Sequence, residues 1–539
     1  MKRISLIALF FLIGLSQVNS QTVGLLCHNE GTLDDGYVLF APIGATTTYL
    51  IDKCGKLMKT WISAYKPGQS VYLLPDGTLF RTGNANNATF IAGGQGGIVE
   101  MIDWDGNVTW SYTVSDTAKC QHHDAKVLPN GNVLIIAWEL KTKTEAIAQG
   151  RNPALVAATL WSEQVLEIQP VGSNGGIVIW EWHLWDHLAQ DFDATKPNFT
   201  SIALNPQLLN LNYGASAAVA DWVHLNSIDY NPTLDQIVLS AHNMSEIWII
   251  DHSTTAAQAS GHSGGNSGKG GDFLYRWGNP QVYNNGTSAD KKFFGQHNAY
   301  WIESGVPFAN QIMVFNNGVA RPGGNYSTVE IINPPVNGYT YMSDVPFLPL
   351  SSSWIYNAGN PNAFNAQNIS GAQQLSNGNV LMCNGPAGTF IEVTTNGTMV
   401  WKYINPVKGA GILPQGNVPT QNLVFRCSFY PKYYSGFSGH VLIPGSIIEN
   451  YNIVSDECIL SLGMNDNKHF DDIQTYPNPT SDYIIITGIS GKTKIFNNSG
   501  TEMWSGLINN TRRIDISEYP SGLYYFLNNN TAYKFIVGK

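Results

Sequence analysis

Short apolar runs separated by tight turns recur along most of the chain. The repeating unit is an apolar strand, a turn and a second apolar strand. It occurs at residues 70–83, 123–139, 224–243, 297–318 and 370–385. Several of the turns contain Asp-Gly or Asn-Gly, which are strong signals of β-hairpins. The pattern therefore predicts a series of hairpins built from short strands.

A second hairpin follows each of these units, at residues 97–113, 165–183, 247–253 with 273–280, 327–343, and 388–406. Two hairpins in succession make a four-stranded sheet, which is the blade of a β-propeller. Residues 48–62 and 421–433 are left over, and together they would form a sixth blade from both chain ends. Such closure leaves no open sheet edge between the terminal blades. We therefore expect an all-β protein with a six-bladed propeller over residues 23–458.

The two ends of the chain have a different character. Residues 1–20 combine Lys2 and Arg3 with an apolar run and small residues before Ser20, which is typical of a secretory signal peptide cleaved after Ser20. No later segment is apolar enough to span a membrane. Residues 459–473 are polar and predict a linker, and the short alternating strands of residues 474–539 predict a small β-sandwich.

Composition narrows the class of partner. The 539 residues carry a formal net charge of −10, and only 13% of them are charged, which argues against nucleic acid. The six cysteines permit disulfides in an exported protein, but they allow 15 connectivities. Their spacing matches no zinc motif, so we expect no metal from them.

Two long segments interrupt the strand pattern. Residues 185–222 form an insertion whose first part, 185–199, is expected to be helix and loop near the mouth of the ring. Residues 261–271 are rich in glycine and serine and predict a flexible loop. This loop is not a phosphate-binding motif, because Gly270 follows Lys269 where serine or threonine is needed.

Histidines occupy one repeated position in the hairpins. His123 and His297 each lie five residues before the last residue ahead of the turn, and His224 lies within one residue of that place. Gln69 and Ser370 hold this position in the two other complete repeats. Three consecutive predicted blades therefore begin their innermost strand with an imidazole.

Two further side chains are expected at the same edge. The start of the first strand and the end of the second meet there, as do the start of the third and the end of the fourth. His242 ends a second strand and Arg276 ends a fourth, so both should face the mouth shared by the histidines. An imidazole can act as a nucleophile, while guanidinium and imidazolium groups can hold a tetrahedral anion. The sequence HHD at residues 122–124 leaves a zinc or copper site open as an alternative, and a non-catalytic propeller that binds glycan or protein is another.

An ordered set of segments resembles the bacterial arylsulfotransferases: HHD before LPNGNVLI, then DWVHLNSIDY, IVLSAHNMSEIWIID, YRWGNP, QHNAYW, VFNNG and VFRCSFYP. The resemblance implies a six-bladed propeller that moves a sulfuryl group from a phenolic sulfate ester to an acceptor phenol. It also implies ping-pong transfer through a sulfated histidine, without the adenylyl-sulfate cofactor PAPS or any other cofactor.

The same resemblance implies roles for individual residues. His297 would be the nucleophile, and His242 and His123 would hold sulfuryl oxygens or transfer a proton. Arg276 would hold the sulfuryl group, although its order relative to tryptophan in YRWG is reversed in many relatives, and SAHN lacks the arginine that commonly precedes the histidine. The residues expected to contact substrate are His224, Asn243, Phe294 and Trp301.

The end of the chain resembles another family. YPNPTSD, DISEYPSGLYYF and the final KFIVGK are similar to the C-terminal sorting domain of the type IX secretion system of Bacteroidetes. This resemblance implies the secretion machinery as a partner and a protein that is secreted or held at the cell surface.

Overall fold

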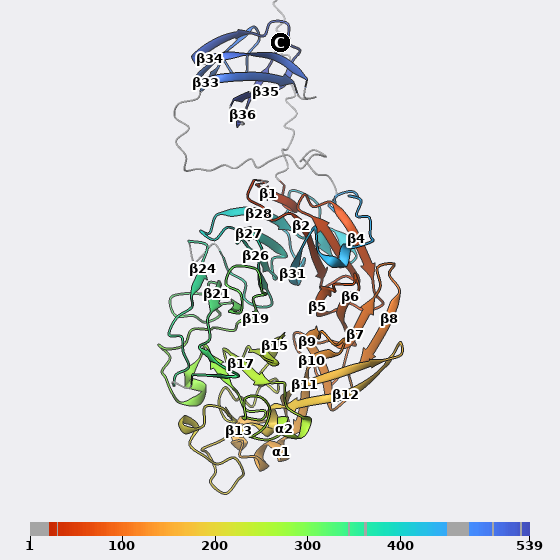
Figure 1. Cartoon of the computed structure of the whole chain (residues 1–539), viewed down its shortest axis with the longest axis vertical. Helices are drawn as coiled ribbons and strands as arrows, with labels where there is room; N and C mark the ends of the chain where they lie inside the picture. Colours follow the sequence, from red (N-terminus) through yellow and green to blue (C-terminus); the bar gives the residue numbers. More distant parts are fainter. Residues whose placement is uncertain are drawn as a thin grey trace, which may run out of the picture. The chain divides into compact units, whose positions relative to one another are not determined.

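The computed structural model describes residues 21–29, 31–342, 345–359, 364–449, 474–497, 501–528 and 531–539. Its contacts divide the chain into two compact units, with the boundary between Leu462 and Gly463 (Figure 1). The predicted signal segment 1–20, Cys458 and the predicted linker 459–473 lie outside the described residues. Each unit is treated by itself below.

The first unit is built from antiparallel sheets of four or five strands, which confirms the predicted all-β class. Five of them come from the predicted pairs of hairpins and follow one another around a common centre (Figure 1). Their strands are β5 (Pro67–Leu73), β6 (Leu79–Asn84), β7 (Gly97–Ile102) and β8 (Val108–Thr113); β9 (Lys119–Val127), β10 (Val133–Thr142), β11 (Thr159–Val171) and β12 (Gly175–His183); β15 (Leu225–Asn231), β16 (Gln236–Ala241), β17 (Glu246–Asp251) and β18 (Tyr275–Trp277); β19 (His297–Trp301), β20 (Ile312–Asn316), β21 (Thr328–Ile332) and β24 (Trp354–Tyr356); and β25 (Gly371–Gln374), β26 (Val380–Asn384), β27 (Thr389–Val393) and β28 (Met399–Ile404).

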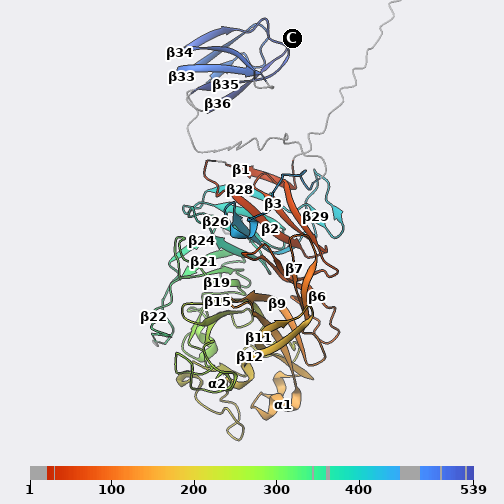
Figure 2. The same cartoon turned by 45° about the vertical axis from the view of Figure 1, so that its right-hand side comes forward.

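A sixth sheet joins the two ends of this unit. Its order is β31 (Val424–Pro431), β2 (Gly36–Pro42), β3 (Thr47–Asp52) and β4 (Leu57–Ile62). The sequence predicted the outer hairpin and the inner strand but not β2, whose seven residues are all buried and show no alternation of polar and apolar positions. It also missed β1 (Gly24–His28), which adds a fifth strand to the edge of β28 (Figure 2).

One predicted hairpin is wrong. We expected residues 327–343 to supply both outer strands of one sheet, but β21 pairs with β24 instead. The intervening β22 (Val336–Asn337) and β23 (Thr340–Tyr341) form a separate ribbon. Pro334 and Pro335 explain the difference, because proline has no N–H to donate to a strand ladder.

The insertion after β12 contains no α-helix, contrary to expectation. It has the 3₁₀ turns η2 (Leu184–Asp186) and η3 (Ile202–Leu204) and one parallel pair, β13 (Leu188–Ala189) with β14 (Leu209–Asn210). The side chains of Gln190 and Asp193 accept hydrogen bonds from backbone N–H groups two and three residues ahead. Such local bonds compete with helical ones and fold the segment into turns.

The remaining elements are short. The helices are α1 (Lys143–Ala148) and α2 (Ala256–Ala259), the further 3₁₀ turns are η1 (Pro153–Leu155), η4 (Pro280–Tyr283) and η6 (Ser435–Phe437), and β29 (Val407–Lys408) pairs with β30 (Gly411–Ile412). Cys54 is disulfide-bonded, whereas Cys27, Cys120, Cys383 and Cys427 are free thiols. Across the described ranges, no helix has the length and apolar character needed to cross a membrane.

The second unit contains β32 (Gln474–Tyr476), β33 (Tyr483–Asn497), β34 (Glu502–Asp515), β35 (Gly522–Asn528) and β36 (Thr531–Val537). Hydrogen bonds connect all of these strands. The long strand β33 pairs with β34 along its length, with β32 near its start and with β35 at its end. Its core is apolar and includes Ile484, Ile495 and Phe526, each 0% exposed.

A buried ion pair connects the sheet of β31 and β2–β4 to the sheet of β25–β28. Lys53, after β3, lies 2.5 Å from the carboxylate of Glu392 in β27, and their side chains are 6% and 0% exposed. Removing one partner of such a pair leaves an uncompensated buried charge. We therefore expect Glu392→Gln to destabilise the first unit by about 3 kcal/mol, measured as the midpoint of denaturant-induced unfolding.

The matched control is Asp35→Asn, which breaks the exposed pair between Asp35 and Lys432 near the same chain ends. Exposed pairs contribute little because water screens them, so the midpoint should not move. Equal midpoints for the two variants would contradict a stabilising role of the buried pair.

Candidate active site

Five imidazoles lie in one continuous row where the inner strands of three sheets meet. The distances between successive ring centroids are 5.1 Å from His122 to His123, 4.5 Å from His123 to His224, 5.3 Å from His224 to His242 and 5.2 Å from His242 to His297. We call these residues the histidine row. The structure thus brings together His123, His224, His242 and His297, as the repeat position predicted.

The backbone places these side chains by a recurring kink. His123 (φ 51°) and His224 (φ 59°) are left-handed, and so are Gln69 (φ 112°) and Ser370 (φ 86°) at the same repeat position of other sheets. In β19 the left-handed residue is Asn298 (φ 55°), one position later. Non-glycine residues rarely adopt this conformation, and it gathers at functional sites where the surrounding structure holds it. The pairing of the inner strands with their neighbours is irregular at or next to these kinks in β5, β9, β15 and β19.

Asn317 orients the ring of His297. His297 begins β19, its side chain is buried, and its Nδ1 lies 2.8 Å from Asn317 Oδ1. The amide nitrogen of Asn317 donates to the carbonyl oxygens of Ala366 and Ile369, so Oδ1 is the accepting atom. Nδ1 of His297 therefore carries the proton, and Nε2 keeps its lone pair.

Asn243 orients His242 in the same way. Nδ1 of His242 lies 2.8 Å from Asn243 Oδ1, and the amide nitrogen of Asn243 donates to the carbonyl oxygen of Asp221. Nδ1 of His242 is thus the donor, which leaves its Nε2 unprotonated as in His297. Asn243 was expected to contact substrate. The structure places it beside His242, where it fixes the tautomer of that ring.

Asp221 gives His224 a different environment. Its carboxylate oxygen Oδ2 lies 2.5 Å from His224 Nδ1, and its other oxygen accepts a hydrogen bond from the indole of Trp138. Burial alone would lower the pKa of His224, but the charge of Asp221 and its hydrogen bond outweigh burial and raise that pKa. His224 is therefore the imidazole of the row that holds a proton most strongly.

The other rings of the row are held neutral. Burial, reinforced by the charge on His224, lowers the pKa of His242 to about 4 and that of His122 to about 3. Burial likewise lowers the pKa of His123 and of His297 well below the ordinary value, again with the neighbouring imidazoles adding to the effect. The row thus combines one cationic ring with neutral ones at neutral pH.

The HHD segment does not gather one ligand set. His122 contacts Glu163 Oε2 at 2.8 Å and stacks on Trp138, while Asp124 binds Arg426 and the hydroxyl of Tyr72. Within the described residues, the group whose three His or carboxylate donor atoms all lie within 4.8 Å of one another is found elsewhere in the unit. The zinc or copper arrangement considered from the sequence therefore does not form at residues 122–124.

Arg276 does not reach the row, contrary to expectation. It is 0% exposed, and its guanidinium donates to Glu246 at 2.6 Å and to the carbonyl oxygens of Pro206 and Leu208. β18 pairs with β17, so Arg276 turns towards Glu246 at the start of β17 and ties the insertion to this sheet. Its role is structural in this arrangement.

Arg426, in the VFRCSFYP segment of β31, is the arginine near the histidines. Its guanidinium donates to Asp124 at 2.6 Å and to the carbonyl oxygen of Asn226 at 2.7 Å, and it lies over the ring of Phe425. Phe425 in turn lies 6.0 Å from His123. The charge of Arg426 also contributes to the low pKa of His123 and of His297. This residue thus connects inner strands of three sheets beside the row.

The two predicted aromatic contacts differ. Phe294 is mostly buried and lies beneath two cations, with Lys291 Nζ 5.0 Å and the Arg321 guanidinium 5.4 Å from its ring centroid. The next residue, Gly295, approaches Nε2 of His242, because a Cβ atom there would lie 3.0 Å away. Trp301 ends β19 and packs in the main apolar core. The structure therefore places Gly295, the residue after Phe294, against the row, whereas Trp301 belongs to the apolar core.

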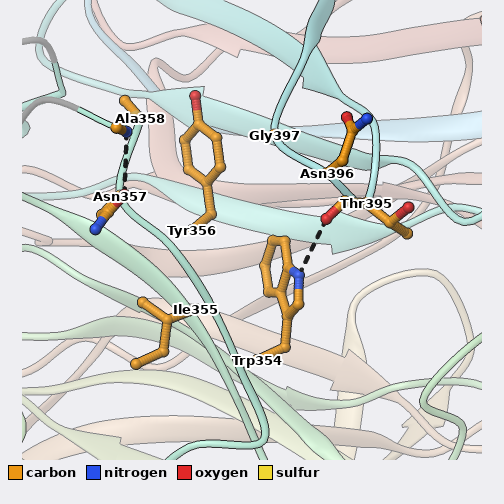
Figure 3. Close-up of a pocket in the computed structure, with 9 residues that line it drawn as sticks. Trp354, Ile355, Tyr356, Asn357, Ala358, Thr395, Asn396 and Gly397 are labelled. Carbon is orange, nitrogen blue, oxygen red and sulfur yellow. Dashed lines mark hydrogen bonds between the residues drawn. The ribbon is translucent and has the colours of Figure 1, made fainter.

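A surface cleft of about 300 Å³ lies elsewhere, between β24 and the turn at residues 395–397 (Figure 3). It is lined by Trp354, Tyr356 and neighbouring residues and contains no histidine. Trp354 donates its indole N–H to the carbonyl oxygen of Thr395 across this cleft. The cleft is therefore separate from the candidate active site.

A family model for arylsulfotransferase (ASST) matches residues 35–426. This range contains the whole histidine row and the strands from β2 to β30, together with the start of β31. The chain belongs to the arylsulfotransferase family. Membership supports aryl sulfotransferase activity in general. A second family model, the secretion system C-terminal sorting domain, matches residues 474–538 and indicates export to the cell surface or beyond.

Comparison with curated proteins found no match. Among solved structures, a protein of unknown function from Bacteroides caccae is 11% identical, with 74% of this chain and all of that chain covered and a TM-score of 0.40. The Cps50 (Swd1) β-propeller domain of Myceliophteria thermophila is 12% identical over 72% of this chain and 89% of that one, with a TM-score of 0.37. Virginiamycin B lyase from Staphylococcus aureus is 12% identical over 72% and 90%, with a TM-score of 0.33. These likenesses are too distant to inform the chemistry of this chain.

Three residues of the site were not singled out from the sequence. Asn317 follows β20 as Asn243 follows β16, so the repeat position after the second strand could have indicated it. Arg426 lies in a segment that the family resemblance had already included. Asp221 belongs to the insertion, where no repeat exists, and its place beside His224 follows only from the folded chain.

A substitution at Gly94 tests whether the position of His123 matters to the activity of this family member. Its φ is +85°, and a Cβ atom there would lie 1.8 Å from Cε1 of His123. Gly94→Ala must therefore displace the ring. We expect aryl sulfotransferase activity to fall about tenfold to a hundredfold, because small misplacements of a reacting group carry costs of this size.

Gly93→Ala is the matched control, since a Cβ atom at Gly93 would meet nothing within 4 Å. That variant should keep wild-type activity in the same assay. Wild-type activity of Gly94→Ala would show that the position of His123 is unimportant.

Proposed function

We propose that the protein is a PAPS-independent aryl sulfotransferase in which His297 carries the sulfuryl group between donor and acceptor. The observation that supports this most directly is the hydrogen bond from His297 Nδ1 to Asn317 Oδ1. It fixes the tautomer in which Nε2 has the lone pair that a nucleophile needs. Burial also keeps this ring neutral, since it lowers the pKa of His297.

In the first half-reaction, Nε2 of His297 attacks the sulfur of an aryl sulfate ester. The N–S bond forms as the bond from sulfur to the aryl oxygen breaks, and the aryl oxide leaves with the electron pair. The imidazole of His297 then bears a positive charge, which the side-chain oxygen Oδ1 of Asn317 stabilises through Nδ1–H. His242 has the lone pair of Nε2 free and passes protons along the row, and His123 holds a sulfuryl oxygen or passes protons too.

His224 and Asp221 supply the proton in this scheme. The His224 imidazolium lies 5.3 Å by ring centroid from His242, which lies next to His297. A cation at this point offsets the negative charge of the aryl oxide, and its proton reaches the leaving oxygen through the row. Asp221 keeps His224 charged until that transfer.

In the second half-reaction, the acceptor phenol loses its proton to the row and its oxygen attacks the sulfur. The new S–O bond forms as the N–S bond to His297 breaks, which returns the lone pair to Nε2. Donor and acceptor therefore occupy the site in turn, as ping-pong kinetics requires. Phe294, with Lys291 and Arg321 against its ring, offers an aromatic and cationic surface that suits an anionic aryl ester.

The fold proposed for this activity is a closed six-bladed β-propeller, with the sheet of β31 and β2–β4 as the closing blade. The antiparallel pairing of β31 with β2 supports this, because it joins the two ends of the family domain. The sorting domain then takes the enzyme through type IX secretion. Its substrates would accordingly be small phenolic sulfates and phenols that it meets outside the cell.

The kinetic test uses p-nitrophenyl sulfate as donor and phenol as acceptor. We expect nitrophenol release to depend on phenol and to give parallel double-reciprocal lines. His297→Gln should lower kcat/KM at least about a thousandfold, because it removes the attacking nitrogen. The matched control is His440→Gln, which changes a histidine stacked on Trp104 outside the row and should leave the rate unchanged.

Three results would count against the proposal. Release that proceeds equally well without phenol would indicate hydrolysis instead of transfer. Absence of release from several aryl sulfates would favour a binding protein. Full activity in His297→Gln would remove the nucleophile from the mechanism.

The pH profile tests the charge distribution of the row. Because burial lowers the pKa of His297, kcat/KM should stay high below pH 6.5, where an ordinary histidine would already be protonated. Because Asp221 raises the pKa of His224, the rate should fall at alkaline pH only as His224 loses its proton. Asp221→Asn removes that carboxylate, so the pKa of His224 drops and the alkaline limb should move to lower pH.

Asp186→Asn provides the control, since Asp186 is an exposed carboxylate of the same insertion. Its profile should match that of the wild type. An alkaline limb that stays in place in Asp221→Asn would show that His224 does not supply the proton.

A further inference from the structure

A second cluster of histidine and carboxylate lies outside the histidine row. It consists of His187 from the insertion, His262 from the glycine-rich loop and Asp272 just before β18. Nδ1 of His187 and Nδ1 of His262 lie 2.9 Å and 2.7 Å from the same oxygen, Asp272 Oδ1. One donor atom from each residue thus falls within 4.8 Å of the other two.

The hydrogen bonds of His187 indicate which of its nitrogens is free to bind. Nε2 lies 2.8 Å from the carbonyl oxygen of Ala259, which can only accept, so Nε2 carries a proton. With a second proton on Nδ1 the ring is an imidazolium paired with Asp272. A divalent cation can take the place of that proton, because Nδ1 then offers a lone pair next to a carboxylate oxygen. A histidine that donates one N–H to a backbone carbonyl while its other nitrogen binds is the usual arrangement around a protein-bound metal ion.

Two of the three residues are buried, and the third is exposed to solvent. His187 and Asp272 have side chains 0% and 6% exposed, whereas His262 is 61% exposed. The ring of His187 stacks on Trp182, whose indole donates to the carbonyl oxygen of Gly271. An ion could therefore enter from the side of His262, and water could complete its coordination.

The donor set selects a class of ion. Two imidazole nitrogens and one carboxylate oxygen suit zinc and similar divalent transition metals, while calcium and magnesium prefer oxygen ligands alone. The three residues also come from segments far apart in the chain. A shared ion would connect the insertion to the loop at residues 261–271 and to the strand that follows it.

We propose that His187, His262 and Asp272 form a structural site for one zinc-class divalent cation. This site is independent of the sulfuryl transfer proposed above. It would fasten the insertion, which also carries Asp221, to the glycine-rich loop. The composition of that loop, rich in glycine and serine, predicted flexibility. Nothing in the sequence indicated that His262 of the loop lies beside Asp272 and His187.

The test measures zinc binding by the full chain after dialysis against a chelator. Calorimetric titration with Zn²⁺ should give one high-affinity equivalent in the wild type and in His440→Gln. His262→Gln should bind this equivalent at least about tenfold more weakly, and its exposed position makes misfolding a poor explanation for any loss. Asp272→Asn should weaken binding too, and circular dichroism should check that this buried variant is folded.

A second readout is the thermal unfolding midpoint, which should rise with added Zn²⁺ in the wild type but not in His262→Gln. His297→Gln separates this site from the histidine row and should retain the zinc equivalent. The proposal is overturned if the wild type binds no zinc, if His262→Gln binds it as tightly as the wild type, or if His297→Gln is the variant that loses it.

Discussion

Imidazoles from three sheets can share one buried row only if few of them are charged at once. Charges of the same sign repel strongly where water is excluded, so each ring lowers the pKa of its neighbours. The partners of the row follow this constraint. His224 has a carboxylate, Asp221, and takes the charge, whereas His242 and His297 have the amides of Asn243 and Asn317 and stay neutral. A neutral amide fixes the tautomer of the ring but, unlike a carboxylate, brings no negative charge that would stabilise the protonated ring. A nitrogen nucleophile requires such a neutral ring.

The histidines are positioned by a backbone conformation that recurs in successive sheets. A left-handed residue lies in or directly before the innermost strand of successive sheets, at His123, at His224 and one position after His297. The same conformation occurs at Gln69 and Ser370, where no histidine is present. The scaffold thus supplies the same kink in each sheet, and the residue type at that position decides whether the sheet contributes an imidazole. Arg426 and Asp124 connect the sheets from within.

The repeats explain what could be predicted from the sequence. Turn residues indicate the register of most hairpins, so the sequence alone places four of the histidines at one edge of the sheets. The predicted position of Arg276, in the fourth strand of its sheet, is correct, but its predicted role is not. Its side chain turns to Glu246, a partner that no repeat indicates. Asp221 and β2 were not predicted, for related reasons. Asp221 lies in an insertion without periodicity, and β2 is buried on both faces and has no alternation of polar and apolar residues.

The most direct test of the account is to locate the sulfuryl group during turnover. The protein would be mixed with p-nitrophenyl sulfate without acceptor, quenched at alkaline pH to preserve an acid-labile N–S bond, and mapped by peptide mass spectrometry. The account predicts sulfation of the peptide that contains His297, and loss of this modification when phenol is added before the quench. Sulfation of a different residue, or transfer to phenol with no modified peptide at any time, would contradict it.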